Sequence, residues 1–161
     1  MDIALSDSDI KRLAPNLSVI LYDQLNHQDI HIPVVILYQT SDNYGHWVLL
    51  HDTVDNQGTK IVEFFDSYSG LPDSQFTKIS QKFQRPHWLT KLLDELNAVV
   101  PIHYNDYPLQ GTGNNIATCG KWCILRDRFD SYTIDQFAQA IAQACDELHL
   151  TPDQLVTQLI S

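Results

Sequence analysis

The sequence lacks any apolar run of the roughly 20 residues that a membrane-spanning helix needs. Its first residues, MDIALSDSDIKRL, are acidic and polar, where a secretory signal would have a basic segment and then an apolar one. No repeat, low-complexity tract or linker rich in glycine, proline or serine divides the 161 residues. We therefore expect one domain, residues 1–161, in an intracellular protein without a membrane partner.

Positive charge is also scarce, because ten lysine and arginine residues face twenty aspartate and glutamate residues, a formal net charge of −10. Such a surface repels a phosphate backbone, so nucleic-acid binding is disfavoured. Cysteine is limited to Cys119, Cys123 and Cys145, an odd set that fits free thiols in a reducing compartment. Because the spacing of Cys119 and Cys123 is C-x-x-x-C and no second ligand pair lies at zinc spacing, we predict no metal site.

Short apolar segments rich in β-branched and aromatic residues predict a central group of strands. They cover residues 33–40 and 46–51, and a third strand follows a turn at Asn56–Gly58 and ends near Asp66. Helices are predicted for SDSDIKRL, for residues 88–96 and for the last third of the chain. Two of them start at the capping boxes of Thr133 and Thr151. We therefore expect an α+β fold with a mixed central β-sheet flanked by helices.

The segment GNNIATCGKWCILR, residues 113–126, places Cys119 where a polar, glycine-containing loop meets an apolar helical run. A helix N-terminus carries about half a positive charge and unpaired N–H groups, which favour ionisation of a thiol and stabilise an adjacent anion. Taken alone, a cysteine is more often a buried structural thiol. The loop-to-helix position beside Gly120 favours a nucleophile.

A nucleophilic cysteine needs a base, a group that orients this base, and donors for the oxyanion of acyl transfer. His46 follows Gly45 at the start of a buried strand and is the candidate base, while Asp66 at the end of the paired strand could orient it. Gln110 offers a side-chain amide to the oxyanion. Taken singly, His46 can be a core histidine and Asp66 a turn carboxylate, and His51 is a competing base.

Three motifs, GHWVLLH, FFDSYSG and PLQGTGNNIATCGKWC, occur in this order and carry a resemblance to a known family. The sequence is similar to the adenovirus-type (adenain-like) maturation cysteine proteases and to their relatives that process SUMO and similar modifiers. It most resembles the compact versions from large DNA viruses, virophages and Maverick/Polinton-type elements, over about residues 17–130. The resemblance implies the adenain-like fold, with the nucleophile at the N-terminus of a central helix.

Carried over residue by residue, the resemblance implies a catalytic triad. His46 of GHW matches the family's general base, Asp66 of FFDS its acidic partner, and Cys119 of TCG its nucleophile. Gln110 of PLQ matches the oxyanion-hole glutamine, and the backbone N–H of Cys119 would be the second donor. No metal or cofactor is implied.

The resemblance also implies a substrate preference. Trp47 resembles the residue that narrows the family's substrate channel and, with Gly120, is expected to bind substrate, so cleavage should follow glycine or another small residue. We expect a monomeric cysteine endopeptidase that acts on polypeptides, matures viral capsid or core precursors in the host cytoplasm or viral factory, and is packaged in the virion. Whether an activating peptide takes part stays open.

The sequence departs from the family in the oxyanion loop. Gln110 stands nine residues before Cys119, a longer interval than the family's, so Asn114 or Asn115 is an alternative donor. Two alternative functions also stay open: a protease that removes SUMO or ubiquitin, and an inactive protease-like module that only binds glycine-containing tails.

The remaining residues of interest have structural interpretations. Cys123, Cys145 and Trp122 are expected in the core. Arg126 and Arg128 follow the predicted nucleophile and are expected to be solvated or ion-paired.

Overall fold

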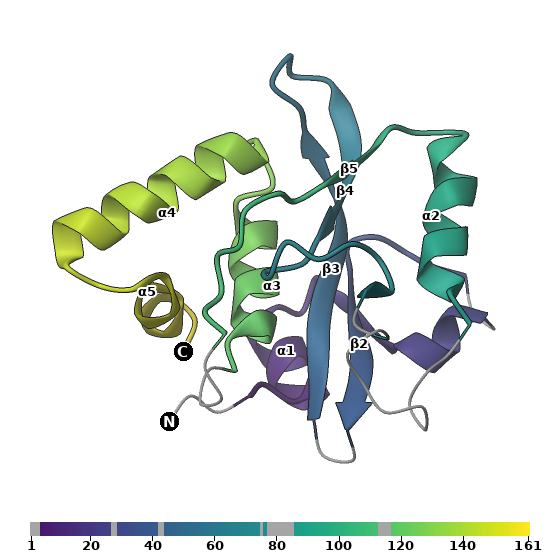
Figure 1. Ribbon diagram of the computed structural model, residues 1–161, viewed down its shortest axis with the longest axis horizontal. Helices are drawn as coiled ribbons and strands as arrows, with labels where there is room; N and C mark the ends of the chain where they lie inside the picture. Colours follow the sequence, from purple (N-terminus) through teal and green to yellow (C-terminus); the bar gives the residue numbers. More distant parts are fainter. Residues whose placement is uncertain (1–3, 27–28, 42–43, 75, 77–85, 113–116) are drawn as a thin grey trace.

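The computed structural model describes residues 4–26, 29–41, 44–74, 76, 86–112 and 117–161. Within them, the centre is a five-stranded sheet in the order β1-β2-β3-β4-β5 (Figure 1). β2, β3 and β4 form an antiparallel meander, and β1 and β5 join its two edges in parallel. The expected α+β class with a mixed sheet is confirmed. The strands are β1 (Ser18–Leu21), β2 (Val34–Ser41), β3 (Tyr44–Val54), β4 (Lys60–Phe65) and β5 (Ile102–Tyr104).

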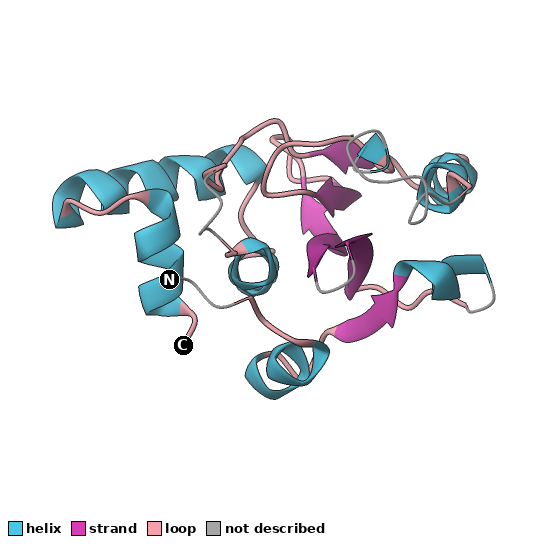
Figure 2. Ribbon diagram, turned by 60° about the horizontal axis from the view of Figure 1, so that its bottom comes forward, coloured by secondary structure: helices cyan, strands magenta, loops and turns pink. Residues whose placement is uncertain are grey.

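Helices cover both faces of this sheet (Figures 1 and 2). On one face, α3 (Cys119–Arg128) lies between the sheet and the pair formed by α4 (Ile134–Leu148) and α5 (Pro152–Leu159), with α1 (Asp7–Leu13) beside it. On the other face lie α2 (Trp88–Asn97) and the 3-10 helix η1 (Tyr22–Asn26). The sheet therefore separates two hydrophobic cores.

β3 contributes to both cores because successive side chains of a strand point to opposite faces. Trp47 and Leu49 pack in the core under α3, whereas Val48 and Leu50 pack in the core under α2. The complete burial of these side chains explains why the strand reads as a continuous apolar run. β3 is thus the central strand of the sheet, and it carries His46 and Trp47 of the candidate site.

The two predicted capping boxes begin α4 and α5. Thr133 accepts a hydrogen bond from the backbone N–H of Gln136 at 3.0 Å, and the Gln136 side chain accepts one from the Thr133 N–H. Thr151 and Gln154 repeat this arrangement ahead of α5, whose first residue is Pro152. Both predicted helix starts are confirmed.

β1 and η1 were not predicted from the sequence. β1 has only four residues, none of them fully buried, and it pairs in parallel with β2 from Ser18 opposite Val34 to Leu21 opposite Leu37. A half-exposed strand of this length has too short a pattern to distinguish it from a loop. Its position depends on β2, which comes later in the chain.

A buried ionic network joins β3, β4 and the C-terminal end of α3. The Arg126 guanidinium donates to the two Glu63 carboxylate oxygens at 2.8 and 3.2 Å, and the His51 ring contacts Glu63 at 3.0 Å and Asp127 at 3.2 Å. Burial lowers the pKa of His51, but its hydrogen bonds to the two carboxylates raise it above its ordinary value. Burial raises the pKa of Glu63, yet the bonds from His51 and Arg126 hold it below its ordinary value. The sequence predicts that Arg126 is either solvated or ion-paired, and the structure shows that it is ion-paired.

Candidate active site

The first residues of β3, before Leu49, extend beyond the end of β4, and His46 lies in this overhang of β3. The antiparallel register between the two strands ends at Leu49 and Phe65, so His46 and Trp47 lie beyond the paired region. Asp66 follows β4 directly, and its Oδ1 atom lies 2.9 Å from His46 Nε2. Both side chains are buried. The β3–β4 hairpin thus joins the predicted base to its predicted orienting carboxylate.

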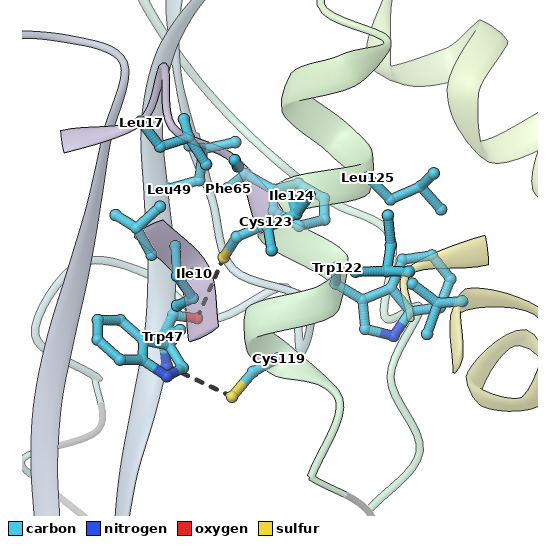
Figure 3. Packing of buried hydrophobic residues seen from close by; sticks show 14 of the residues in the cluster. Ile10, Leu17, Trp47, Leu49, Phe65, Cys119, Trp122, Cys123, Ile124 and Leu125 are labelled. Atoms are coloured by element: carbon cyan, nitrogen blue, oxygen red, sulfur yellow. Dashed lines mark hydrogen bonds between the residues drawn. The ribbon is translucent and has the colours of Figure 1, made fainter. Parts of the chain in front are cut away.

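Cys119 is the first residue of α3, and its sulfur faces the overhang of β3 (Figure 3). The backbone N–H of Trp47 donates to Cys119 Sγ at 3.4 Å, and one helical turn later Cys123 Sγ donates to the Trp47 carbonyl at 3.6 Å. Cys119 also lies close enough to His46 to raise the pKa of its imidazole. The structure therefore brings His46, Asp66 and Cys119 together at one end of the sheet.

Hydrogen bonds and negative charge control the protonation of His46. Burial lowers the pKa of its imidazole, but the hydrogen bond to Asp66 and the proximity of Cys119 raise it to about 10. This raised pKa favours the protonated imidazole at neutral pH. Because Nε2 contacts Asp66, Nδ1 is the ring nitrogen left for Cys119. An imidazolium in this place can pair with a thiolate and later give its proton to a leaving amine.

The loop after β4 fixes Asp66. Its Oδ1 atom also accepts the backbone N–H of Tyr68 at 2.8 Å, and the Tyr68 ring stacks on the His46 ring at 4.9 Å between centroids. The Asn105 side chain donates to the Asp66 carbonyl at 2.8 Å. A Cβ atom on Gly70 would lie 2.7 Å from Asp66 Oδ2, so the loop needs glycine there. The backbone and ring of Tyr68 and the carboxylate of Asp66 thus together support the His46 imidazole.

Gln110 is bonded to the same loop. Its Oε1 atom accepts a hydrogen bond from the Ser67 hydroxyl at 2.6 Å, and its backbone N–H donates to the Ser67 carbonyl at 3.0 Å. Because the oxygen of the side-chain amide faces Ser67, its NH₂ group points away from Ser67. Gln110 is buried, with 4% of its surface exposed. The predicted oxyanion donor is therefore held by a residue next to Asp66.

The two predicted substrate-binding residues touch each other. Trp47 is buried, and its indole N–H donates to the Leu5 carbonyl at 3.0 Å. A Cβ atom on Gly120 would lie 3.1 Å from Trp47 Cδ1 and 3.3 Å from Leu5 Cβ, so Gly120 is packed closely against both residues. The alternative oxyanion donors Asn114 and Asn115 lie outside the described residues.

The other cysteines and Trp122 take structural places. Cys123, Cys145 and Trp122 are buried in the core, as expected, and all three cysteines are free thiols. Across the part of the chain that the structure describes, no group of three or more His, Cys, Asp or Glu side chains is placed to hold a metal ion. None of the helices described is both long enough and apolar enough to cross a bilayer.

Sequence reasoning missed four residues that support this site. Ser67 and Tyr68 lie inside the motif FFDSYSG that was used for Asp66, so the motif itself was the available signal. Asn105 and Asp153 come from distant segments, and their contacts with the site depend on tertiary packing. No local pattern in the sequence marks them.

Comparison with known proteins gives one informative result. No family model matches the sequence. A protein of Sputnik virophage, described as uncharacterized protein V9, is 33% identical over 170 residues. The alignment covers 98% of this chain and 94% of the virophage protein. The similarity therefore extends over nearly the full length of both proteins.

Proposed function

The chain belongs to the family of the Sputnik virophage protein V9, and we propose that it is a cysteine endopeptidase with the triad His46, Asp66 and Cys119. One observation carries the proposal: a histidine bonded to a buried carboxylate at 2.9 Å lies beside a cysteine at the first position of a helix, whose sulfur accepts the N–H of Trp47, the residue after this histidine, at 3.4 Å. A structural cysteine needs neither the protonated histidine nor its carboxylate partner. Together the three groups supply a nucleophile, a proton carrier and an orienting group.

The proposed reaction proceeds through an acyl-enzyme. The Cys119 thiolate attacks the carbonyl carbon of the scissile bond, and the C=O electron pair moves to the oxygen, which is held by the Cys119 N–H and the Gln110 amide. His46 gives its Nδ1 proton to the leaving amine as the C–N bond breaks. Neutral His46 then takes a proton from water, which attacks the thioester and releases the acid and the thiolate.

The substrates are proposed to be polypeptides with a small residue before the cut. The resemblance of Trp47 to the residue that narrows the family's substrate channel supports this preference. The relationship to a virophage protein supports a viral setting, and we propose capsid or core precursors as substrates. Cleavage would take place in the viral factory or in the virion, without a cofactor.

Mapping new N-termini by mass spectrometry tests this function. A peptide library and the virion structural proteins are incubated separately with the wild type and with Cys119→Ala. We expect cuts that follow glycine or another small residue and that are absent from the variant samples. Failure of the wild type to produce cuts, both alone and with peptides from the virion added, would count against a protease and favour a binding module.

Removing the Gln110 side chain should impair the chemical step. Gln110→Ala is expected to lower kcat by about 10²–10³-fold, as loss of an oxyanion donor does. Ser67→Ala removes only the hydroxyl that orients the amide and should cost about tenfold or less. Gln143→Ala, on the exposed surface of α4, is the control and should match the wild type. Steady-state kinetics on one cleaved peptide give all three values.

The opposite ranking would change the assignment of the oxyanion donor. A mild effect of Gln110→Ala combined with a severe effect of Asn114→Ala or Asn115→Ala would move this role to one of the two asparagines. Circular dichroism of each variant checks that the fold is retained.

A further inference from the structure

Asp153, in the first turn of α5, is a buried carboxylate that the proposed reaction does not use. It accepts three hydrogen bonds: from the Gly111 N–H at 2.8 Å, from the Thr118 hydroxyl at 2.5 Å and from the Trp122 indole N–H at 3.2 Å. Only 8% of its surface is exposed, and these partners are all neutral. A buried carboxyl group is costly unless donors satisfy its oxygens, so these three contacts hold the Asp153 side chain in place.

Two of the three donors flank residues of the proposed active site. Gly111 directly follows Gln110, and Thr118 directly precedes Cys119. The carboxyl group of Asp153 therefore holds the backbone of Gly111 and the side chain of Thr118, one beside the oxyanion glutamine and the other beside the nucleophile. Because one side chain bonds both residues, α5 helps to set the distance between them.

The bond to Asp153 also changes how α3 begins. Thr118 is the N-cap residue of α3, but its side chain makes no capping hydrogen bond. Thr133 and Thr151, at the equivalent positions of α4 and α5, each accept a first-turn backbone N–H. The Thr118 hydroxyl is directed to Asp153 instead. A capping threonine would accept an N–H of the second or third residue of α3, so the Thr118 hydroxyl forgoes this bond in favour of Asp153.

We propose that Asp153 is a positioning residue that fixes the two oxyanion donors, the Gln110 amide and the Cys119 N–H, relative to each other. This inference rests on the proposed protease activity. Asp153 acts through Gly111 and Thr118 and does not touch the substrate. A displacement of about 1 Å in a positioned group can cost about 10²-fold in rate, so a residue of this kind has a measurable effect on turnover.

Kinetics of two Asp153 variants test the inference. Asp153→Ala is expected to lower kcat on a cleaved peptide by about 100-fold and to change KM less than about threefold, because the donors act mainly in the transition state. Asp153→Asn keeps one acceptor oxygen and brings an NH₂ group toward a donor, so its kcat should lie between those of Asp153→Ala and the wild type. It also serves as the test variant if Asp153→Ala does not fold.

Thr151→Ala is the matched control, because it weakens the start of the same helix without removing a bond to Gly111 or Thr118. Alkylation by iodoacetamide supplies a second readout, since it displaces iodide from carbon and forms no oxyanion. The alkylation rate of Cys119 should stay within about threefold of the wild type in Asp153→Ala, because the thiol is not the group displaced. Equal losses of kcat in Asp153→Ala and Thr151→Ala, or a loss of alkylation that parallels kcat, would reduce Asp153 to a residue that only supports folding.

Amide hydrogen exchange separates the inference from the protease activity. The Gly111 N–H is expected to exchange at least about tenfold faster in Asp153→Ala than in Thr151→Ala, because its acceptor is gone. Equal exchange in the two variants would overturn the positioning role even if the wild type cleaves no peptide. A wild type that cleaves, together with an Asp153→Ala variant of unchanged kcat, would overturn the positioning role and leave the proposed function intact.

Discussion

Cys119→Ala is expected to abolish peptide cleavage, with kcat falling about 10⁶-fold, as loss of the nucleophile does in serine proteases. The sulfur of Cys119 lies beside the His46–Asp66 pair, where it accepts the backbone N–H of Trp47 at 3.4 Å. Without it no acyl-enzyme forms, and the oxyanion donors act only on an uncatalysed attack by water. The loss is measured as the rate on a cleaved peptide, with the thermal stability of the variant as a check on its fold.

Cys123→Ala is the matched control, one turn further along the same helix. Burial, followed by the nearby charge of Cys119, raises the pKa of Cys123 well above its ordinary value, so its thiol stays neutral and unreactive. The variant leaves a small cavity and loses one weak hydrogen bond to the Trp47 carbonyl. It should therefore be less stable but active. If a folded Cys123→Ala were inactive and Cys119→Ala retained turnover, the nucleophile would have been assigned to the wrong cysteine.

Arg126→Met is expected to lower the free energy of unfolding by about 3–5 kcal/mol, the usual cost of removing one partner from a buried ion pair. Arg126 is completely buried, and its loss leaves His51 as the remaining partner of the buried Glu63 carboxylate. The guanidinium also donates to the carbonyls of Phe129 and Tyr132 and to the hydroxyl of Thr53, which lose these donors as well. Urea unfolding followed by circular dichroism measures the change.

Arg128→Met provides the comparison, because Arg128 lies in the same last turn of α3 and makes one exposed hydrogen bond to the Leu13 carbonyl. Its replacement should cost at most about 1.5 kcal/mol. Similar decreases in the free energy of unfolding of the two variants would mean that the buried network of Arg126 stabilises the fold no more than an exposed hydrogen bond does. The result matters for the active site because this network joins β3, β4 and α3, the three elements that carry the proposed triad.

The proximity of His46 and Asp66 could be predicted from the sequence because it follows from a hairpin. Two adjacent antiparallel strands bring the start of the first close to the end of the second, so a residue at each position can meet. The helix start at Cys119 could be predicted for a similar reason, since a polar loop followed by an apolar run is a local pattern. These features depend on short-range rules.

The supports of the site could not be predicted, because they depend on packing between distant segments. Ser67 meets Gln110 only after the chain has passed through α2 and β5 and returned to the loop after β4. Asp153 has the sequence pattern of an ordinary first-turn acidic residue, and nothing local distinguishes it from Asp135 in α4. The role of Asp153 becomes visible only when α5 packs on α3.

Among the residues assigned to the proposed site and its positioning, Asp153 is the last to be synthesised. Ribosomes extend a chain from the N-terminus at about 5–20 residues per second, so Cys119 is made seconds before Asp153. In that interval Gly111 and Thr118 have no acceptor from α5. On the proposed function, a chain that ends before α5 would carry its nucleophile without the group proposed to set its oxyanion donors.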